Sequence, residues 1–153
     1  MTYSATRKDD AQKAMIELKE ISVKKLVMLI GDSKLVGETI ARQLGLDQVY
    51  AELLPDQKVE KLEMLERQRK TKGKLLFGGD GINDAPAPVL ARADVGVAMG
   101  GLGSDAAIEA ADVVIMTDEP SKLVDAIKLP KGHEASYGRI YFSPLALKLS
   151  YLF

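Results

Sequence analysis

Three oxygen-bearing side chains, Asp80, Asn83 and Asp84, lie within five residues in the stretch 79–86, which reads GDGINDAP. Hard oxygen donors at this density suit Mg²⁺. Because Mg²⁺ usually takes only one or two protein carboxylates and fills its remaining positions with water and phosphate oxygens, Asp80 and Asp84 would suffice as ligands. Asn83 would then orient a phosphate or a water. The alternative is that both aspartates only cap turns and a helix start, which is common for Asp and Asn beside Gly.

Three further features could carry chemistry, and each also has a purely structural interpretation. Lys58 falls in the first turn of a helix opened by Pro55, where a lysine is either a surface charge or a cation that neutralises phosphate oxygens. The stretch 100–105, GGLGSD, matches no nucleotide-binding fingerprint and indicates a Gly-rich turn with a serine cap. His133 is the single histidine and has no partner cluster, which favours a loop position.

The elements that must position these residues alternate between strands and helices. The apolar run 25–30 is typical of a strand buried on both faces of a parallel sheet, and it ends at Gly31-Asp32. Further strands are expected at 48–51, 75–78, 95–99 and 113–116, and helices near 11–18, 35–44, 55–65, 104–110 and 121–127. This alternation predicts a parallel α/β sheet with right-handed crossovers. Ligands of such sheets bind at the carboxyl ends of the strands, where Asp32 and Asp80 fall.

Composition limits the remaining function classes. The chain has 153 residues, a net charge of -1 and 46% hydrophobic residues, as expected for one soluble globular domain. It has no cysteine, which excludes disulfides and thiolate sites. Near-neutral charge argues against nucleic acid or an anionic membrane as the main partner. The polar N-terminus carries no secretory signal, so we expect a cytoplasmic protein.

The C-terminal stretch 140–153 is mostly apolar but contains Pro144 and Lys148. It is shorter than the roughly 20 residues that a membrane helix needs. Two interpretations stay open: a hydrophobic helix packed on the domain, or a severed membrane segment.

Five strings in the chain resemble the phosphorylation domain of P-type ATPases, in the family's order. They are MLIGDS (28–33), AELLP (51–55), GDGINDAP (79–86), ADVGVAMG (93–100) and AIEAADVV (107–114). The GGLGSD variant at 100–105 is most similar to zinc, cadmium or lead exporters. The resemblance covers roughly residues 10–127. It implies a partial phosphorylation domain over 1–130 and a hydrophobic tail over 131–153 that resembles the start of a membrane helix.

The resemblance implies a haloacid-dehalogenase-like Rossmannoid fold, in which an aspartate attacks the γ-phosphate of ATP and the resulting aspartyl-phosphate drives ion transport. The parent family lies in the cell membrane with this domain in the cytoplasm. By matching position, the resemblance gives Asp80 and Asp84 as the Mg²⁺ ligands, Lys58 and Asn83 as phosphate contacts, and Gly31 and Asp32 as the loop of the second motif.

The chain also departs from the family's pattern. The family's nucleophile lies in an Asp-Lys-Thr-Gly-Thr string on a central strand, and no such string occurs in these 153 residues. Ile30 stands where the family has a phosphate-contacting threonine, so ATP or phosphate should bind only weakly. Ala87-Pro88 resembles a two-residue insertion, which moves the expected helix start to Pro88 and would displace Asp84 relative to Asp80.

The expected fold therefore lacks its central nucleophile strand, which would leave backbone groups unpaired on both neighbouring strands. Either the sheet repacks or another chain supplies a strand. The favoured function is a partial phosphorylation domain of a heavy-metal P-type ATPase that has no catalytic nucleophile and is not active alone. The alternatives are a non-catalytic interaction module completed by another chain, and a phosphatase that uses Asp32 or Asp80 as nucleophile.

Overall fold

A computed structural model describes residues 2–21, 23–69, 73–79, 87–100, 105–117, 119–128 and 139–142. Helices and strands alternate along the described chain. The helices are α1 (Thr2–Glu20), α2 (Lys34–Leu44), α3 (Pro55–Arg67), α4 (Ala87–Arg92), α5 (Asp105–Ala110) and α6 (Ser121–Lys128). The strands are β1 (Lys25–Leu29), β2 (Gln48–Tyr50), β3 (Leu75–Gly79), β4 (Val95–Met99), β5 (Val113–Ile115) and β6 (Arg139–Phe142).

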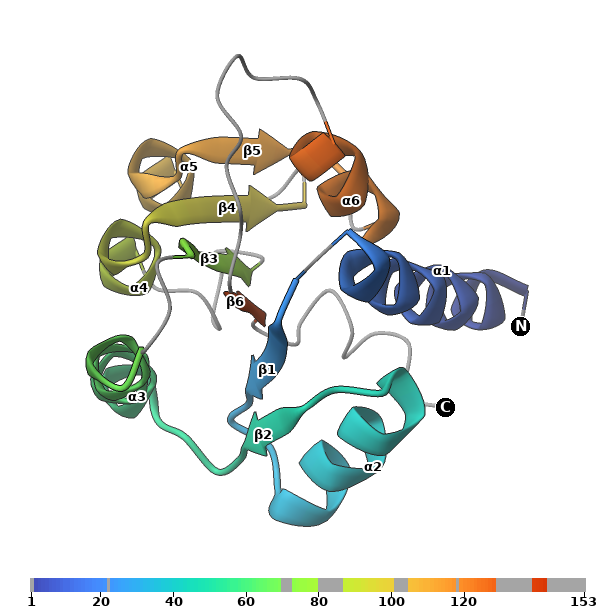
Figure 1. The fold of residues 1–153 in the computed structure, drawn as a ribbon, viewed down its shortest axis with the longest axis horizontal. Coiled ribbons are helices and arrows are strands. Elements are labelled where there is room, and N and C mark those ends of the chain that lie inside the picture. Colours follow the sequence, from blue (N-terminus) through green and yellow to red (C-terminus); the bar gives the residue numbers. More distant parts are fainter. Residues whose placement is uncertain are drawn as a thin grey trace.

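The strands form one six-stranded sheet in the order β2-β1-β6-β3-β4-β5, and every neighbouring pair is parallel. Helices cover both faces: α1, α2 and α6 lie on one side of the sheet and α3, α4 and α5 on the other (Figure 1). The predicted parallel α/β fold is confirmed. The consequence for function is that all strands present their carboxyl ends at the same edge.

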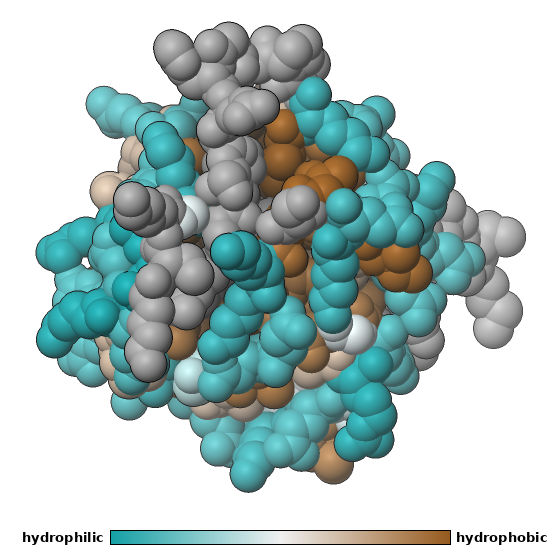
Figure 2. All heavy atoms as spheres, in the orientation of Figure 1, coloured by the Kyte–Doolittle hydropathy of each residue, from teal (hydrophilic) through white to brown (hydrophobic). Residues whose placement is uncertain are grey.

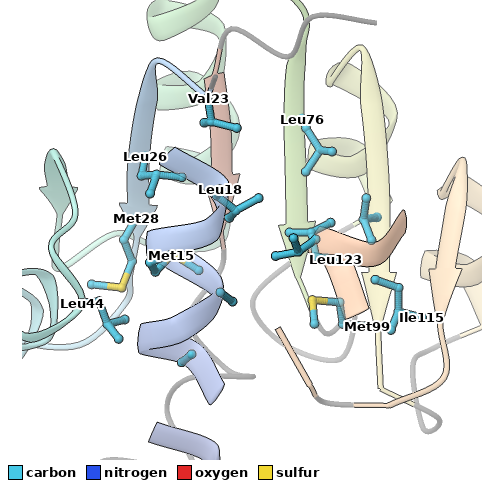
Figure 3. Close-up of a cluster of buried hydrophobic side chains, with 14 of the residues drawn as sticks. Met15, Leu18, Val23, Leu26, Met28, Leu44, Leu76, Met99, Ile115 and Leu123 are labelled. Atoms are coloured by element: carbon cyan, nitrogen blue, oxygen red, sulfur yellow. The ribbon is translucent and has the colours of Figure 1, made fainter. Parts of the chain in front are cut away.

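Successive residues of the central strands pack into two separate hydrophobic clusters. Leu26 and Met28 of β1 join the cluster under α1, α2 and α6, whereas Val27 and Leu29 join the cluster under α3, α4 and α5. Figure 3 shows the first cluster, in which Met15 and Leu18 of α1, Leu76 of β3 and Leu123 of α6 meet over the sheet. Burial on both faces explains why the run 25–30 is almost continuously apolar.

Local signals fix the ends of the helices around the site. The Ser33 hydroxyl accepts a hydrogen bond from Val36 N (3.4 Å) at the start of α2, and Gly45 ends that helix in a left-handed conformation with φ 64°. Pro55 opens α3, and Gln57 Oε1 accepts from Leu54 N (2.9 Å). The predicted start of this helix at Pro55 is confirmed.

The centre of the sheet is filled by a strand that the sequence pattern did not predict. The sequence predicted that the nucleophile strand is missing and that either the sheet repacks or another chain supplies a strand; in the structure β6 lies at the centre and pairs in parallel with β1 and β3. It gives partners to backbone groups that would otherwise be buried and unpaired, which is the physical reason for its place at the centre. Residues 140–142 therefore form part of a strand where a helix was one expectation, while 143–153 lie outside the described residues.

Polar side chains dominate the face seen in Figure 2, and apolar atoms reach the surface there in separate places. No helix in the described part of the chain is both long enough and apolar enough to cross a membrane.

Candidate functional site

The carboxyl ends of β1 and β2 are joined by backbone hydrogen bonds between the loops that follow them. Glu52 N donates to Asp32 O (2.8 Å), and Leu53 N donates to Ile30 O (3.1 Å). These bonds hold the Gly31-Asp32 loop against the segment that leads into α3. At the edge predicted to bind ligands, the loops that follow β1 and β2 are therefore bonded to each other.

Gly31 is required by the closeness of this contact. A Cβ atom at Gly31 would lie 3.2 Å from the carbonyl oxygen of Leu53, which is tighter than most real Cβ contacts. The other side of the contact carries a backbone cost, because Glu52 has a positive φ of 59° although it is not glycine. A non-glycine residue in this conformation is uncommon and is found most often where the surroundings demand it.

Lys58 is fully buried, with 1% of its surface exposed, and is the single buried charged residue among those the structure describes. It lies in the first turn of α3, where its backbone N donates to Leu54 O (3.0 Å). Of the two interpretations left open for Lys58, the surface charge is therefore excluded. Lysine is almost never fully buried without paired or hydrogen-bonded surroundings, so its position favours a specific anionic contact over a general surface role.

The predicted magnesium ligands Asp80 and Asp84 lie outside the described residues, as do Asn83, His133 and residues 101–104. The elements flanking the magnesium loop are described. Gly79 ends β3, is buried and directly precedes Asp80, so the chain enters the loop at the carboxyl edge of the sheet. The ligand assignment itself stays a prediction.

The helix after this loop begins at Ala87, one residue before the expected start at Pro88. Pro88 therefore lies in the first turn, where the missing backbone N–H has no intrahelical partner to lose. Among the described residues, no group of three or more His, Asp or Glu side chains gathers as a metal site.

Three aspartates outside the sequence-based site perform a different task at the amino edge of the sheet. Each directly precedes a strand, and its carboxylate accepts a backbone hydrogen bond at the beginning of the neighbouring strand. Asp47 accepts from Leu26 N (2.7 Å), Asp94 from Leu75 N (2.7 Å), and Asp112 from Gly96 N (2.8 Å).

The aspartate bonds are reinforced by the main chain in two cases, since Asp47 N donates to Leu26 O (2.9 Å) and Asp112 N to Gly96 O (2.8 Å). These three side chains are engaged in fixing strand positions. The sequence analysis missed this role, although the signal was present: Asp stands immediately before an apolar strand at 47, 94 and 112. Two of these aspartates fall inside strings that carried the family resemblance, so part of that resemblance reflects structure and not chemistry.

Asp94 also binds Arg69, whose Nη1 lies 2.7 Å from Asp94 Oδ2. Burial alone would raise the pKa of Asp94, but the hydrogen bond from Leu75 N and the Arg69 guanidinium outweigh it and hold the pKa below its ordinary value. The carboxylate form is therefore favoured by the fold. Arg69 Nη1 donates in addition to Gly73 O (2.9 Å), which ties the end of α3 to the start of β3.

A cavity of about 250 Å³ adjoins the carboxyl edge near β2. Its lining includes Lys34 and Glu38 of α2 and Lys61 of α3, and Lys61 Nζ lies 4.5 Å from the centroid of the Tyr50 ring. Glu52 lines the cavity as well, and Lys34 forms an ion pair with Glu38 (3.7 Å), so the two lysines are balanced by two glutamates. The cavity lining therefore carries no net charge that would select an anionic ligand.

Comparison with known proteins agrees with the fold. The family model for haloacid dehalogenase-like hydrolases matches residues 4–92. Over 124 residues the chain is 58% identical to the cadmium, zinc and cobalt-transporting ATPase of Bacillus subtilis (strain 168) and 58% identical to the zinc-transporting ATPase of Synechocystis sp. (strain ATCC 27184 / PCC 6803 / Kazusa). Each alignment covers 81% of this chain and 17% of the relative.

Among solved structures, the catalytic domain of the CPx-ATPase CopB-B superposes with a TM-score of 0.66 at 32% identity, covering 78% of this chain and 45% of that one. The chain therefore spans a small part of the transport ATPases that it matches. It belongs to the haloacid dehalogenase-like hydrolase family, and its sequence resembles the catalytic domain of the heavy-metal-transporting P-type ATPases within that family.

Proposed function

We propose that the chain is the Mg²⁺- and phosphate-binding part of the phosphorylation domain of a heavy-metal P-type ATPase, of the type that serves zinc or cadmium export. The observation that carries the proposal is the burial of Lys58 at the edge where β1 and β2 end. A lysine in this position supplies a fixed positive charge in a site shielded from water, where its attraction to phosphate oxygens is strongest.

The residues of this edge take separate roles in the proposal. Lys58 neutralises phosphate oxygens. The loop Gly31-Asp32 shapes the wall of the site, held in place by the bonds from Glu52 N to Asp32 O and from Leu53 N to Ile30 O. Asp80 and Asp84 would hold Mg²⁺, whose share of the chemistry is to neutralise charge on the phosphate. The donor set fits that ion, because two carboxylates on a short loop leave positions for water and phosphate oxygens.

We further propose that the 153 residues do not form a phosphoenzyme by themselves. The string Asp-Lys-Thr-Gly-Thr is absent from them, and the strand at the centre of the sheet reads Arg-Ile-Tyr-Phe, which contains no carboxylate. A site with bound Mg²⁺ and phosphate but without an attacking carboxylate binds the ligand and does not turn it over. Weak binding is expected, because Ile30 offers no hydroxyl group to phosphate.

The test is calorimetric titration of Mg²⁺ into the full chain, with and without beryllium fluoride as a phosphate mimic. We expect binding that is strengthened by beryllium fluoride and lost in Asp80→Ala. Asp125→Ala is the matched control, because this exposed aspartate lies on α6 and has no role in the proposed site, and it should bind as the unchanged chain does. Equal binding by both variants, or no binding up to about millimolar Mg²⁺, contradicts the proposal.

A further inference from the structure

The strand order contains one interruption. Strands β1 and β2 are consecutive in the sequence and adjacent in the sheet, and the same holds for β3, β4 and β5. Strand β6 follows all of them in the sequence but lies between these two groups. Without β6 the sheet would consist of two halves, one ending at β1 and the other at β3. In Figure 3, β6 can be followed between these two strands.

The two halves are also held together away from β6. On one face, Asp10 Oδ2 of α1 accepts from Ser121 N (3.1 Å), and Glu17 of α1 binds Lys128 of α6 (3.0 Å). On the other face, Glu63 of α3 forms an ion pair with Arg92 of α4. Both hydrophobic clusters contain residues from both halves.

These contacts connect the two halves on both faces of the sheet, with β6 between β1 and β3. Adjacent strands lie about 4.7–4.9 Å apart, so the gap between β1 and β3 takes a single strand. Its two walls are the backbone edges of strands that are buried, and each unpaired buried N–H or C=O would cost about 1–3 kcal/mol. The gap therefore has to be filled.

The register of β6 fits both walls. Ile140 pairs with Leu26 of β1 and with Leu76 of β3, and Tyr141 pairs with Val27 and with Phe77. All four residues of the strand, Arg139–Phe142, have a Cα partner on each side. A parallel strand of four residues thus completes the ladder on both walls.

We propose that the gap between β1 and β3 is a strand-binding site that the chain closes with its own segment 139–142, so that a strand from another chain can enter only by displacing it. The segment 139–142 fills the gap in place of such a strand, and in this sense it inhibits strand binding by its own chain. The occupant of the isolated molecule is this segment in cis. This inference rests on the sheet topology and does not depend on the proposed phosphate chemistry.

The position of β6 is tested by disulfide formation in the full chain, which has no cysteine of its own. Val27 and Tyr141 are paired across the β1–β6 ladder, and neighbouring strands are close enough for a disulfide. Oxidation of the double variant Val27→Cys/Tyr141→Cys at low protein concentration should give an intramolecular disulfide in most molecules. The control pair Val114→Cys/Tyr141→Cys should stay reduced, because Val114 lies on β5, beyond β3 and β4.

Each outcome decides the point. Intramolecular crosslinking restricted to the first pair supports the proposal. Covalent dimers formed by the first pair would place the segment in the gap of a second copy and overturn it. Equal yields from both pairs, or none from either, would also overturn it, because the segment would then have no fixed place in the sheet.

The exchange step is tested with a fluorescent peptide of residues 136–146. In the full chain, Tyr141→Pro removes a ladder donor from the internal strand and weakens its hold on the gap. We expect this variant to bind the peptide about tenfold or more tightly than the unchanged chain does, as measured by fluorescence polarisation. A peptide carrying the same proline should not bind. Equal peptide affinity for both chains, or none for either, contradicts the proposal, and the disulfide test remains decisive if the proline variant does not fold.

Discussion

Replacing Asp94 by alanine removes the carboxylate that fixes the beginning of β3. Asp94 Oδ2 accepts from Leu75 N and from Arg69 Nη1, each at 2.7 Å. Leu75 is 1% exposed, so water reaches its freed N–H poorly. A hydrogen bond to a charged acceptor contributes about 1.5–3 kcal/mol. The ion pair adds less than about 1 kcal/mol, because the side chains of Arg69 and Asp94 are 26% and 33% exposed.

After allowance for this solvent screening, Asp94→Ala should lower the free energy of unfolding by about 2 kcal/mol. For a chain of this length that loss lowers Tm by about 4–8 °C. Urea denaturation followed by circular dichroism measures the loss of unfolding free energy, and heating followed by the same signal measures the fall in Tm. Arg69→Ala is the control, because it removes the ion pair and the bond to Gly73 O but leaves the Leu75 bond in place, so its cost should stay below that of Asp94→Ala. Equal costs for the two variants would refute the reasoning that the backbone bond dominates.

The same variant carries a pH dependence. Because the fold lowers the pKa of Asp94, its carboxylate stabilises the folded state above the unfolded-state pKa of about 3.9, and this stabilisation is lost as the pH falls through the folded-state pKa. The stability difference between the unchanged chain and Asp94→Ala should therefore be full near neutral pH and shrink in acid below about pH 4. A stability difference between the two chains that stays constant from neutral pH into acid contradicts the lowered pKa of Asp94.

Three further changes test other parts of the structure. A Cβ atom at Gly96 would lie 2.6 Å from the Leu90 carbonyl oxygen, so Gly96→Ala should destabilise the fold by about 1–3 kcal/mol in urea denaturation, and an unchanged midpoint would show that α4 and β4 can move apart freely. Glu52→Gly relieves the positive φ and should leave Tm unchanged or raised, whereas a clear fall would assign a stabilising role to the Glu52 side chain. Lys58→Met should weaken beryllium fluoride binding about 10- to 100-fold in calorimetry, and unchanged affinity would remove Lys58 from the phosphate site.

Much of the fold could be predicted because its signals are local. The apolar run that forms β1, the proline that opens α3 and the strand 95–99 act through burial, backbone geometry and side-chain alternation within a few residues. The carboxyl edge could be predicted as well, since parallel strands must end together. The family resemblance selected Lys58, which spacing alone left between a surface charge and a phosphate contact; its burial depends on how α3 packs.

The origin of the central strand was not predictable from local pattern. Arg139–Phe142 follows α6 in the chain and pairs with strands that lie more than 60 residues earlier in the sequence at β3 and more than 100 earlier at β1. Its pairing depends on the unpaired edges of those strands, which no pattern within residues 139–142 reveals. The aspartates before β2, β4 and β5 were missed for a similar reason: their partners are backbone groups on neighbouring strands.

The central claim is that Mg²⁺ and phosphate bind at the carboxyl edge of the sheet, and amide chemical-shift mapping of the isotope-labelled chain tests it most directly. Adding Mg²⁺ with beryllium fluoride should shift the amides of Gly31, Asp32, Lys58 and residues 80–85, and leave those of Asp47 and Asp112 at the amino edge unchanged. Shifts concentrated at the amino edge, or no saturable shifts at millimolar Mg²⁺, would contradict the account.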